Sequence, residues 1–468
     1  MTTPSLILHL GLGSFHRAHQ AVYVHNLIQS GDTRWALAGG NIRPDMAETI
    51  AVLQAQGGTY TLETVTPAGE RSYQRIESIK TIVPYDAELS GLIALGADDD
   101  TRIISFTVTE AGYYLDAQNR LDLSFPDLGL DLKSAKKRGA GNPAGSTIYG
   151  ALTAILRERM KRSDAPVTLM NCDNLRHNGD RSRAGLLQFI EMTGEMDLLA
   201  WVLSHTTSPN AMVDRITPRP TAEVVERVKA ATGVADPAAL MGESFIQWVI
   251  EDNFANGRPA WETVGVEMVE SVQPYEEAKI RLLNATHSCI AWAGTLVGHL
   301  YIHEGTQDAP IRQFAYDYAT DDVIPVLSPS PLDLAAYRDV VLDRFSNPAI
   351  RDTNQRVAMD GFSKIPGFIT PTVRERLARS EPIDSVAVLP ALFLAYLQRW
   401  HLGQIPYEYQ DQAMDPVAAH QICEAPDPVA AFCADTVLWG PLAGDARLVA
   451  AMRSAGDRVA TFVKEHKT

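Results

Sequence analysis

The first forty residues of the chain constrain its fold most strongly. The apolar run Ser5–Leu10 ends in the turn Gly11-Leu12-Gly13, and a helical pattern over residues 20–28 and a second apolar run over residues 35–38 follow it. A strand, a glycine turn, a helix and a second strand in this order form the opening unit of a doubly wound α/β domain. We therefore predict a Rossmann-type N-terminal domain.

Two further runs, residues 103–108 and 167–170, have the composition of buried strands. Each is followed by polar residues: Thr109 and Glu110 follow the first run, and residues 171–174 follow the second. Ligands of parallel sheets bind beyond the carboxyl ends of the strands. We therefore expect a ligand near both clusters, and Thr109 and Glu110 to contribute to its site.

The glycine turn has features of a dinucleotide-binding site. Two glycines between a strand and a helix let the backbone approach a pyrophosphate, and the helix N-terminus favours its negative charge. The candidate cofactor contacts in this turn are Gly11, Gly13 and Phe15. Where the usual fingerprint has a third glycine, the chain has Arg17 or Ala18. The turn alone therefore leaves an ordinary tight turn open as the alternative.

The residues after the turn allow two interpretations. Arg17 is a candidate for binding a cofactor phosphate. Alternatively, His16 and His19 on either side of it lock the helix onto the sheet, and we favour this second interpretation for the histidines.

The end of the second predicted strand bears on the choice between NAD and NADP. An acidic residue there accepts hydrogen bonds from the adenosine ribose and repels a 2′-phosphate, whereas an arginine attracts that phosphate. The strand ends in Gly39-Gly40-Asn41, and the nearest charged residues are Arg43 and Asp45. We expect Asn41 and Asp45 to contact the cofactor and favour NAD, while Arg43 leaves NADP open.

A second domain is expected because 468 residues exceed one ordinary hydrophobic core. From about residue 275 onward strand signals almost vanish, and helical patterns cover residues 275–298, 311–320, 332–345, 386–400 and 446–463. We predict a dinucleotide-binding domain over residues 1–270 and a mainly α-helical, substrate-binding domain over residues 271–468.

Composition excludes several classes of partner. The net charge of −16 disfavours nucleic acids and anionic membranes, which are polyanions. The four cysteines are scattered without a Cys-x-x-Cys pair, which fits a reducing cytoplasm and suggests no zinc site. The most apolar segment, residues 386–397, is too short to span a bilayer. We expect a cytoplasmic protein that needs no metal, and no protein partner is implied.

A group of chemically useful side chains lies at helical spacing around Lys279. At about 100° per residue, Glu276 falls about 60°, His287 about 80° and Asn284 about 140° from Lys279. A buried lysine whose pKa is lowered can remove a hydroxyl proton, and amide groups can hold an oxygen on which negative charge develops. The spacing by itself is equally compatible with a solvated helix face that carries a capped histidine.

Taken together, these segments resemble the long-chain polyol dehydrogenases, the family of mannitol 2-dehydrogenase and fructuronate reductase. The resemblance runs nearly end to end. The segments that carry it are residues 11–19, 107–113, 171–174, 177–179, 213–218 and 360–366 and the pattern Lys279-x₅-Asn284-x₂-His287.

The resemblance implies a role for each matching residue. Lys279 resembles the family's general base, Asn174 and Asn284 the pair that holds the reacting oxygen, and His287 the group that orients the substrate. Glu276, one turn before Lys279, either passes the proton to solvent or steadies the ammonium.

Three further positions match substrate contacts of the family. They are Asp214, Arg356 and Lys364. Each has a purely structural alternative, since Asp214 could cap a turn with Arg215 and the two cations could lie on the surface.

The implied reaction is NAD-dependent oxidation of a polyol to a ketose and its reversal, without a metal. Within the family, the segments 38–43, 245–249, 280–292 and 406–411 resemble those of enzymes that interconvert D-arabinitol and D-xylulose, and this resemblance implies that pair. The alternatives are D-mannitol with D-fructose, a hexuronate such as fructuronate or tagaturonate, and, from another class, a nucleotide-sensing protein that has lost catalysis.

Overall fold

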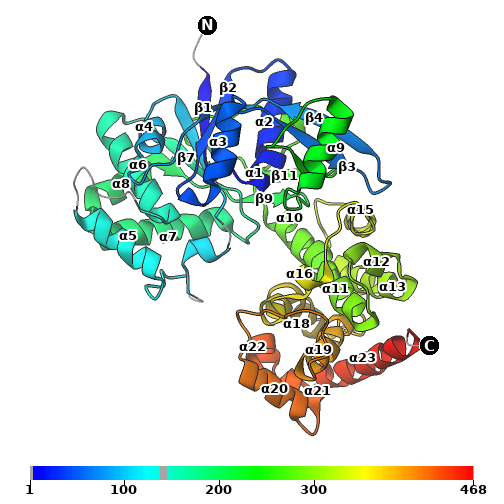
Figure 1. Ribbon diagram of the computed structural model, residues 1–468. Coiled ribbons are helices and arrows are strands. Elements are labelled where there is room, and N and C mark those ends of the chain that lie inside the picture. The colour runs from blue at the N-terminus through cyan, green and yellow to red at the C-terminus, as the bar shows by residue number, and fades with distance from the viewer. Residues whose placement is uncertain (1–3, 109, 117–118, 138–144, 467–468) are drawn as a thin grey trace. The chain divides into compact units, whose positions relative to one another are not determined.

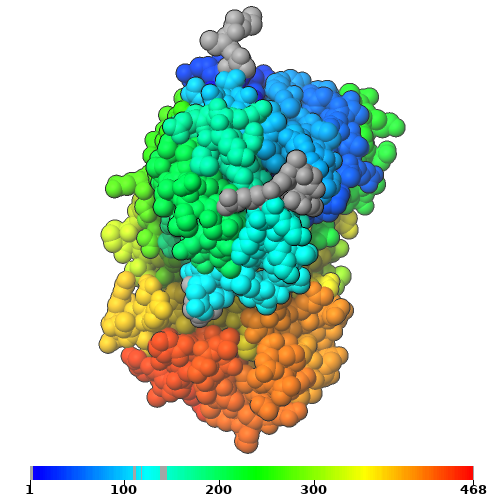
Figure 2. All heavy atoms as spheres, turned by 90° about the vertical axis from the view of Figure 1, so that its left-hand side faces the viewer, coloured from blue at the N-terminus to red at the C-terminus, as the bar shows by residue number. Residues whose placement is uncertain are grey.

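The computed structural model describes residues 4–108, 110–116, 119–137 and 145–466 (Figure 1, Figure 2). Residue contacts divide the chain into two compact units. Unit 1 comprises Met1–Val65 and Arg71–Gln273, and unit 2 comprises Thr66–Glu70 and Pro274–Thr468.

The core of unit 1 is a six-stranded parallel sheet of order β5-β2-β1-β6-β7-β8. The strands are β1 (Ser5–Leu10), β2 (Trp35–Gly40), β5 (Ile79–Ile82), β6 (Thr101–Phe106), β7 (Val167–Asn171) and β8 (Thr206–Thr207). The chain runs from β1 to β2 on one side, whereas β6 pairs on the other side, so the strand order reverses at β1. A ligand crevice is expected at this reversal, and the predicted doubly wound fold is confirmed.

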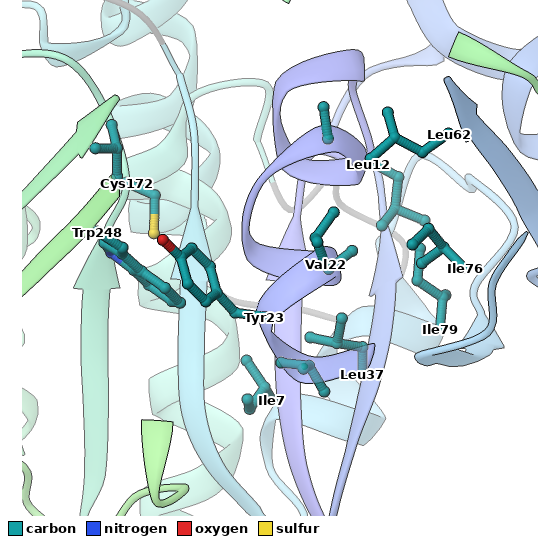
Figure 3. Close-up of a cluster of buried hydrophobic side chains, with 14 of the residues drawn as sticks. Ile7, Leu12, Val22, Tyr23, Leu37, Leu62, Ile76, Ile79, Cys172 and Trp248 are labelled. Carbon is teal, nitrogen blue, oxygen red and sulfur yellow. The ribbon is translucent and has the colours of Figure 1, made fainter. Parts of the chain in front are cut away.

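Two apolar layers cover the sheet, because successive strand residues point to opposite faces. Ile7 of β1 packs with Val22 and Tyr23 of α2 (Gln20–Gln29) in one buried cluster, part of which Figure 3 shows. The next residue, Leu8, belongs to a separate cluster with Leu152 of α6 (Ile148–Arg162). Other helices of unit 1 are α1 (Ser14–Ala18), α3 (Ala47–Ala55), α4 (Ser90–Gly96), α5 (Pro126–Lys137), α7 (Asn178–Thr193), α8 (Met196–His205) and α9 (Ala222–Thr232).

Unit 1 also contains two small sheets that the sequence patterns do not predict. One has the order β10-β3-β4 (Leu240–Glu243, Tyr60–Val65, Arg71–Ile76), and the other has the order β12-β11-β9 (Glu267–Val269, Gln247–Glu251, Ala211–Asp214). β3 and β10 pair in parallel although about 175 residues separate them along the chain. Local periodicity gives no sign of such a pairing.

Unit 2 is helical, as predicted. Its central helix α11 (Ala285–Val297) is buried on nearly all sides, as expected for a helix that is apolar all round. Four helices contact α11: α12 (Ile302–Gln307), α13 (Ala309–Asp317), α16 (Asn354–Ala358) and α19 (Val388–His401). The other helices of unit 2 include α15 (Leu334–Phe345), α17 (Gly361–Lys364), α18 (Thr370–Ala378), α20 (Pro416–Glu424), α21 (Pro428–Ala434), α22 (Thr436–Trp439) and α23 (Ala446–Glu465). Within residues 274–466, three stretches of helix are π-helical: η4 (Lys279–Asn284), η5 (Tyr318–Val323) and η6 (Ile365–Ile369).

Among the described helices, none combines the length and the apolar character needed to cross a membrane. All four cysteines are free thiols; Cys172, Cys289 and Cys433 are buried, and Cys423 is half-buried.

Candidate functional site

A cavity of about 550 Å³ lies in unit 1 at the carboxyl ends of β1, β2 and β6. This volume is in the usual range for a small-molecule or cofactor pocket. Its lining includes Gly11, Gly13, Phe15, His16, Asn41, Arg43, Asp45, Thr107, Val108, Gly112, Tyr114, Phe125, Asp127, Ser146 and Ile148. Most of the sequence-predicted cofactor residues therefore lie around one cavity.

The glycine turn forms the floor of this cavity. Gly11 has φ of +115°, a conformation that side chains rarely adopt, and a Cβ there would lie 3.3 Å from the carbonyl oxygen of Thr107. A Cβ on Gly13 would meet no atom within 4 Å. The structure thus requires glycine at position 11 for its own backbone, while the absence of a side chain at position 13 leaves space that a ligand can approach closely.

Arg43 and Asp45, two charged residues at the cavity rim, differ in the hydrogen bonds that they make. Arg43 donates from Nε to the carbonyl oxygen of Ser146 (2.8 Å) and from Nη2 to the hydroxyl of Tyr114 (2.7 Å), and it lies 3.5 Å from Asp127. Asp45 is exposed, and its carboxylate makes no hydrogen bond within the described parts of the chain. The carboxylate of Asp45 is therefore available to a ligand, whereas the guanidinium of Arg43 is already hydrogen-bonded to the protein.

Asn41 has a structural bond as well as a place in the lining. Its Oδ1 accepts a hydrogen bond of 2.8 Å from the backbone N–H of Leu12. The side chain of Asn41 thereby fixes the glycine turn to the end of β2.

Arg17 does not line the cavity in this structure, and the expectation that it binds a cofactor phosphate stays a prediction. Its guanidinium is buried and donates 2.7 Å to the carbonyl oxygen of Ala238, with the ring of Tyr60 5.4 Å away. The side chain is directed toward the packing of α1 against β10 and β3 because the buried carbonyl of Ala238 needs a donor there.

The histidines of this segment attach α1 to the sheet, as the alternative interpretation expected. His16 stacks on His9 of β1 with 3.6 Å between ring centroids. His9 accepts a hydrogen bond from Ser105 and donates one to the carbonyl of Gly11, and burial lowers its pKa to about 3. His19 donates 2.8 Å to the carbonyl of Gln247. Burial also lowers the pKa of His16, so His9 and His16 are neutral packing rings rather than proton carriers.

A buried polar network joins the ends of β6 and β7. Both carboxylate oxygens of Asp173 accept from the backbone N–H of Val108 at 3.0 Å, and the Tyr113 hydroxyl donates to Asp173 at 3.1 Å. Asn171 donates to the same hydroxyl and accepts from the N–H of Asp173. Burial and the neighbouring Asp173 carboxylate raise the pKa of Tyr113. Sequence reasoning missed Asp173 as a residue that shapes this site, although it lies within the polar cluster after β7.

Other predicted residues of unit 1 are placed as follows. Asn174 is exposed in the bend directly after Asp173. Asp214 is the buried last residue of β9, and the adjacent Arg215 donates to the carbonyls of Ala18 and Glu243, so the arginine serves packing. Thr109 and the side chain of Glu110 lie outside the described residues.

In unit 2, Lys279 and Asn284 are the first and last residues of the π-helical turn η4. The regular α-helical spacing assumed from the sequence is wrong here. In a π-helix the hydrogen bonds run from i to i+5, so residues five apart lie nearly above one another. The turn brings Asn284 to the same side as Lys279 instead of about 140° away, and such π turns are frequent at functional sites.

Both Lys279 and Glu276 are buried side chains, with 6 % and 4 % of their surface exposed. Charged groups are rarely buried to this degree unless they have a defined environment. An ammonium at position 279 is therefore sensitive to its surroundings, which is the condition for a lysine that exchanges a proton.

Further along the same continuous helix, His287 stands in a cluster with two helices that follow in the chain. Its Nε2 lies 3.2 Å from Asp352, and its ring stacks on Phe345 with 4.2 Å between centroids. Arg356 of α16 donates to the same carboxylate through Nε at 2.7 Å. Burial lowers the pKa of His287, although the Asp352 carboxylate opposes the shift.

Lys364 completes this cluster. Its ammonium donates 2.6 Å to the carbonyl oxygen of Val357, and burial, with the nearby Arg356 cation, lowers its pKa to about 8. The expectation that Arg356 and Lys364 are substrate-positioning cations remains a prediction. Neither is an unattached surface cation in this structure.

No group of three or more His, Cys, Asp and Glu side chains that could hold a metal ion occurs in the described part of the chain. The arrangement in unit 2 is instead one of nitrogen donors and cations: Lys279, Asn284, His287, Arg356 and Lys364. Such groups can bind hydroxyl oxygens and exchange a proton.

Comparison with known proteins gives full-length matches. Residues 5–263 match the family profile described as "Mannitol dehydrogenase Rossmann domain", and residues 271–460 match "Mannitol dehydrogenase C-terminal domain". The chain is 60 % identical over 457 residues to D-arabinitol 4-dehydrogenase of Ralstonia nicotianae, covering 97 % of this chain and 96 % of the relative. It is 54 % identical to the protein of the same name from Klebsiella pneumoniae, over 97 % and 98 % of the two chains.

A solved structure matches equally completely. The mannitol 2-dehydrogenase of Pseudomonas fluorescens, solved as a ternary complex with NAD and D-mannitol, is 32 % identical with a TM-score of 0.83, covering 99 % of this chain and 94 % of that one.

Proposed function

The chain belongs to the mannitol dehydrogenase family, and on that basis we propose that it is an NAD-dependent polyol dehydrogenase that interconverts D-arabinitol and D-xylulose. The observation that carries the chemistry is the buried Lys279 in a π turn with Asn284. The choice of D-arabinitol is supported by the 60 % identity with a D-arabinitol 4-dehydrogenase over 97 % of the chain.

The cavity of unit 1 fits a dinucleotide. The positive φ of Gly11 and the open space at Gly13 allow a pyrophosphate to lie against the backbone. We assign the ribose contact to Asp45, because its carboxylate makes no hydrogen bond within the described parts of the chain and would repel a 2′-phosphate. When bound, NAD supplies the hydride acceptor. The further contacts proposed here are Phe15, Asn41, Thr109 and Glu110.

We assign proton exchange to Lys279. In its neutral form the amine takes the hydroxyl proton of the carbinol as the carbon loses hydride, and in the reverse direction the ammonium returns that proton. Amide groups of Asn174 and Asn284 donate to the reacting oxygen and stabilise the negative charge that grows there. Glu276, buried one turn before Lys279, either relays the proton to solvent or steadies the ammonium.

The other proposed roles concern the substrate's remaining hydroxyls. We assign them to His287, Asp214, Arg356 and Lys364. A hexuronate would require a cation dedicated to its carboxylate, whereas Arg356 is already paired with Asp352. This pairing supports an uncharged polyol as the substrate. The four free thiols support a cytoplasmic location.

The test is a substrate panel with the purified full-length protein. D-arabinitol, D-mannitol and fructuronate are assayed in the appropriate direction with NAD(H) and with NADP(H). We expect the highest kcat/KM for D-arabinitol with NAD, and no loss of activity after treatment with EDTA. A preference for fructuronate contradicts the substrate assignment, and NADH binding without turnover of any polyol or ketose contradicts the enzymatic function.

A further inference from the structure

One buried carboxylate in unit 2 is shared by two of the proposed substrate contacts. Asp352 Oδ2 lies 3.2 Å from Nε2 of His287, and the two carboxylate oxygens accept from Nε and Nη2 of Arg356 at 2.7 and 2.5 Å. Its side chain is 9 % exposed, whereas that of Arg356 is 65 % exposed. Sequence reasoning did not single out Asp352, and the proposed mechanism gives it no role.

The backbone fixes this carboxylate in position. The carbonyl oxygen of Asp352 accepts 2.9 Å from the N–H of Ile302, and the next residue, Thr353, forms an isolated β-bridge with Tyr301. Arg351, directly before it, has φ of 53°, in the left-handed region that non-glycine residues rarely adopt. Strain of this kind persists where the surrounding structure holds it, and it is typical of functional sites.

The shared contacts determine the charge of the pair. Burial alone would raise the pKa of Asp352, but the contacts with His287 and Arg356 lower it overall, so the carboxylate is ionised. An ionised carboxylate only accepts hydrogen bonds. Nε2 of His287 is buried, lies 3.2 Å from this carboxylate and has no other polar partner among the described residues, so the negative charge favours a proton on that nitrogen.

The other ring nitrogen of His287 is then defined as well. Burial lowers the pKa of His287, so the ring is neutral near pH 7 and carries a single proton. With that proton on Nε2, Nδ1 holds a lone pair. Nδ1 makes no hydrogen bond to any residue of the described chain, and Phe345 stacked on the ring restricts its rotation.

We propose that Asp352 is a positioning residue of the polyol reaction: it holds His287 as the Nε2–H tautomer, so that Nδ1 accepts a hydrogen bond from a substrate hydroxyl. The same carboxylate orients Arg356 and offsets its charge, which suits the cluster to an uncharged polyhydric substrate. This inference rests on the proposed function, which assigns His287 to the substrate. Partners that orient a metal-bound histidine are typically worth about 10- to 100-fold in activity, and we expect an effect of the same order for Asp352.

The test combines kinetics with a direct measurement of the tautomer. We compare the wild type, D352N, H287A and the double variant in kcat and KM for D-arabinitol at saturating NAD, and in the Kd for NADH. D343N is the matched control, because Asp343 also pairs with an arginine of unit 2 (Arg312, 3.3 Å) but is largely exposed. Selective ¹⁵N-histidine labelling reports which nitrogen of His287 is protonated, with H287A identifying the signal.

We expect D352N to lower kcat/KM about 10- to 100-fold, mainly through KM, with the Kd for NADH unchanged within twofold. Adding D352N to H287A should cost less than about threefold, since the two residues act as one unit. D352E should recover part of the loss, and D343N should resemble the wild type. The wild-type spectrum should show His287 protonated on Nε2.

Two results would overturn the inference: a kcat/KM of D352N within twofold of the wild type, or protonation of His287 on Nδ1 in the wild type. The spectrum of the wild type decides the question even if D352N does not fold. Absence of polyol turnover by the wild type contradicts the proposed function instead, so the two failures are distinguishable.

Discussion

The cavity of unit 1 and the proposed reactive residues of unit 2 differ in the groups that form them. The cavity is shaped by backbone, through the positive φ of Gly11 and the open space at Gly13. The proposed reactive side chains of unit 2 are mostly charged: Lys279 and the carboxylate of Asp352 are buried, Lys364 is half-buried, and Arg356 is exposed. This difference indicates that a dinucleotide is recognised mainly through backbone conformation, whereas proton exchange depends on single side chains in a controlled environment.

The largest expected effect is that of K279A. Removing the proposed proton acceptor should lower kcat for D-arabinitol by about 10²- to 10⁴-fold, the range of general acid–base catalysis. The Kd for NADH, measured by fluorescence titration, should stay within about twofold because the cavity belongs to unit 1. Near-normal turnover of K279A would refute the assignment, and a comparable loss of NADH affinity would remove the distinction between the two regions.

Substitutions of Gly11 and Gly13 should change different properties of the protein. G11A forces a side chain into a positive-φ position with its Cβ 3.3 Å from Thr107 O and should cost about 1–3 kcal/mol of stability. G13A meets no protein atom within 4 Å, so it should leave the melting temperature unchanged while weakening NADH binding roughly tenfold or more. Thermal unfolding and NADH titration of both variants check this contrast. Normal NADH affinity in G13A would contradict the placement of the pyrophosphate.

Lys364 should make the stability of the folded protein vary with pH in the alkaline range. The pKa of Lys364 is lowered to about 8 by burial, below the 10.5 of an unperturbed lysine. Between these values the unfolded chain binds the proton and the folded chain does not, so stability rises with pH across this window. Below pH 8 the charged ammonium of Lys364 lowers the free energy of unfolding by its full amount.

Comparing K364M with the wild type tests this sign. Melting temperatures of both proteins are measured from pH 7 to pH 10.5. The wild type should gain stability relative to K364M as pH rises. A constant difference between the two would show that Lys364 titrates at its ordinary pKa.

The smallest expected effect concerns Arg43. Its contacts with Tyr114, Ser146 and Asp127 hold it at the cavity rim, and Asp127 also adds a negative charge near a 2′-phosphate. D127N should raise the ratio of NADP to NAD activity roughly threefold, since exposed ion pairs contribute less than about 1 kcal/mol. D252N, which removes an equally exposed partner of Arg258, is the control. An unchanged ratio would mean that Asp45 alone determines cofactor choice.

The fold was largely predictable from local patterns. The apolar runs at β1, β2, β6 and β7 and the helical spacing beyond residue 275 are properties of short segments, and the structure confirms the α/β unit and the helical unit. The small sheets were not predictable, because β3 pairs with β10 from a distant part of the chain. Such pairings leave no periodic signal in either segment.

The candidate site shows the same division. Lys279, Asn284 and His287 were predicted from their spacing and from the family pattern, yet the helical wheel misplaced Asn284 because η4 is π-helical. Arg17 was assigned to the cofactor, but its guanidinium lies against Ala238. Asp173 and Asp352 were missed because their importance depends on which groups they contact.

The amino-acid sequence by itself determined the types of secondary structure, the glycine turn and the chemical character of the reactive side chains, since these follow from short-range sterics and hydrophobic periodicity. Only the tertiary structure decided that Asp352 joins His287 to Arg356, that Lys364 is half-buried near a second cation, and that Arg43 is hydrogen-bonded to Tyr114 at the cavity rim. The physical reason is that hydrogen bonds, burial and the resulting pKa shifts depend on neighbours that packing brings together, and the spacing of residues along the chain does not contain that information.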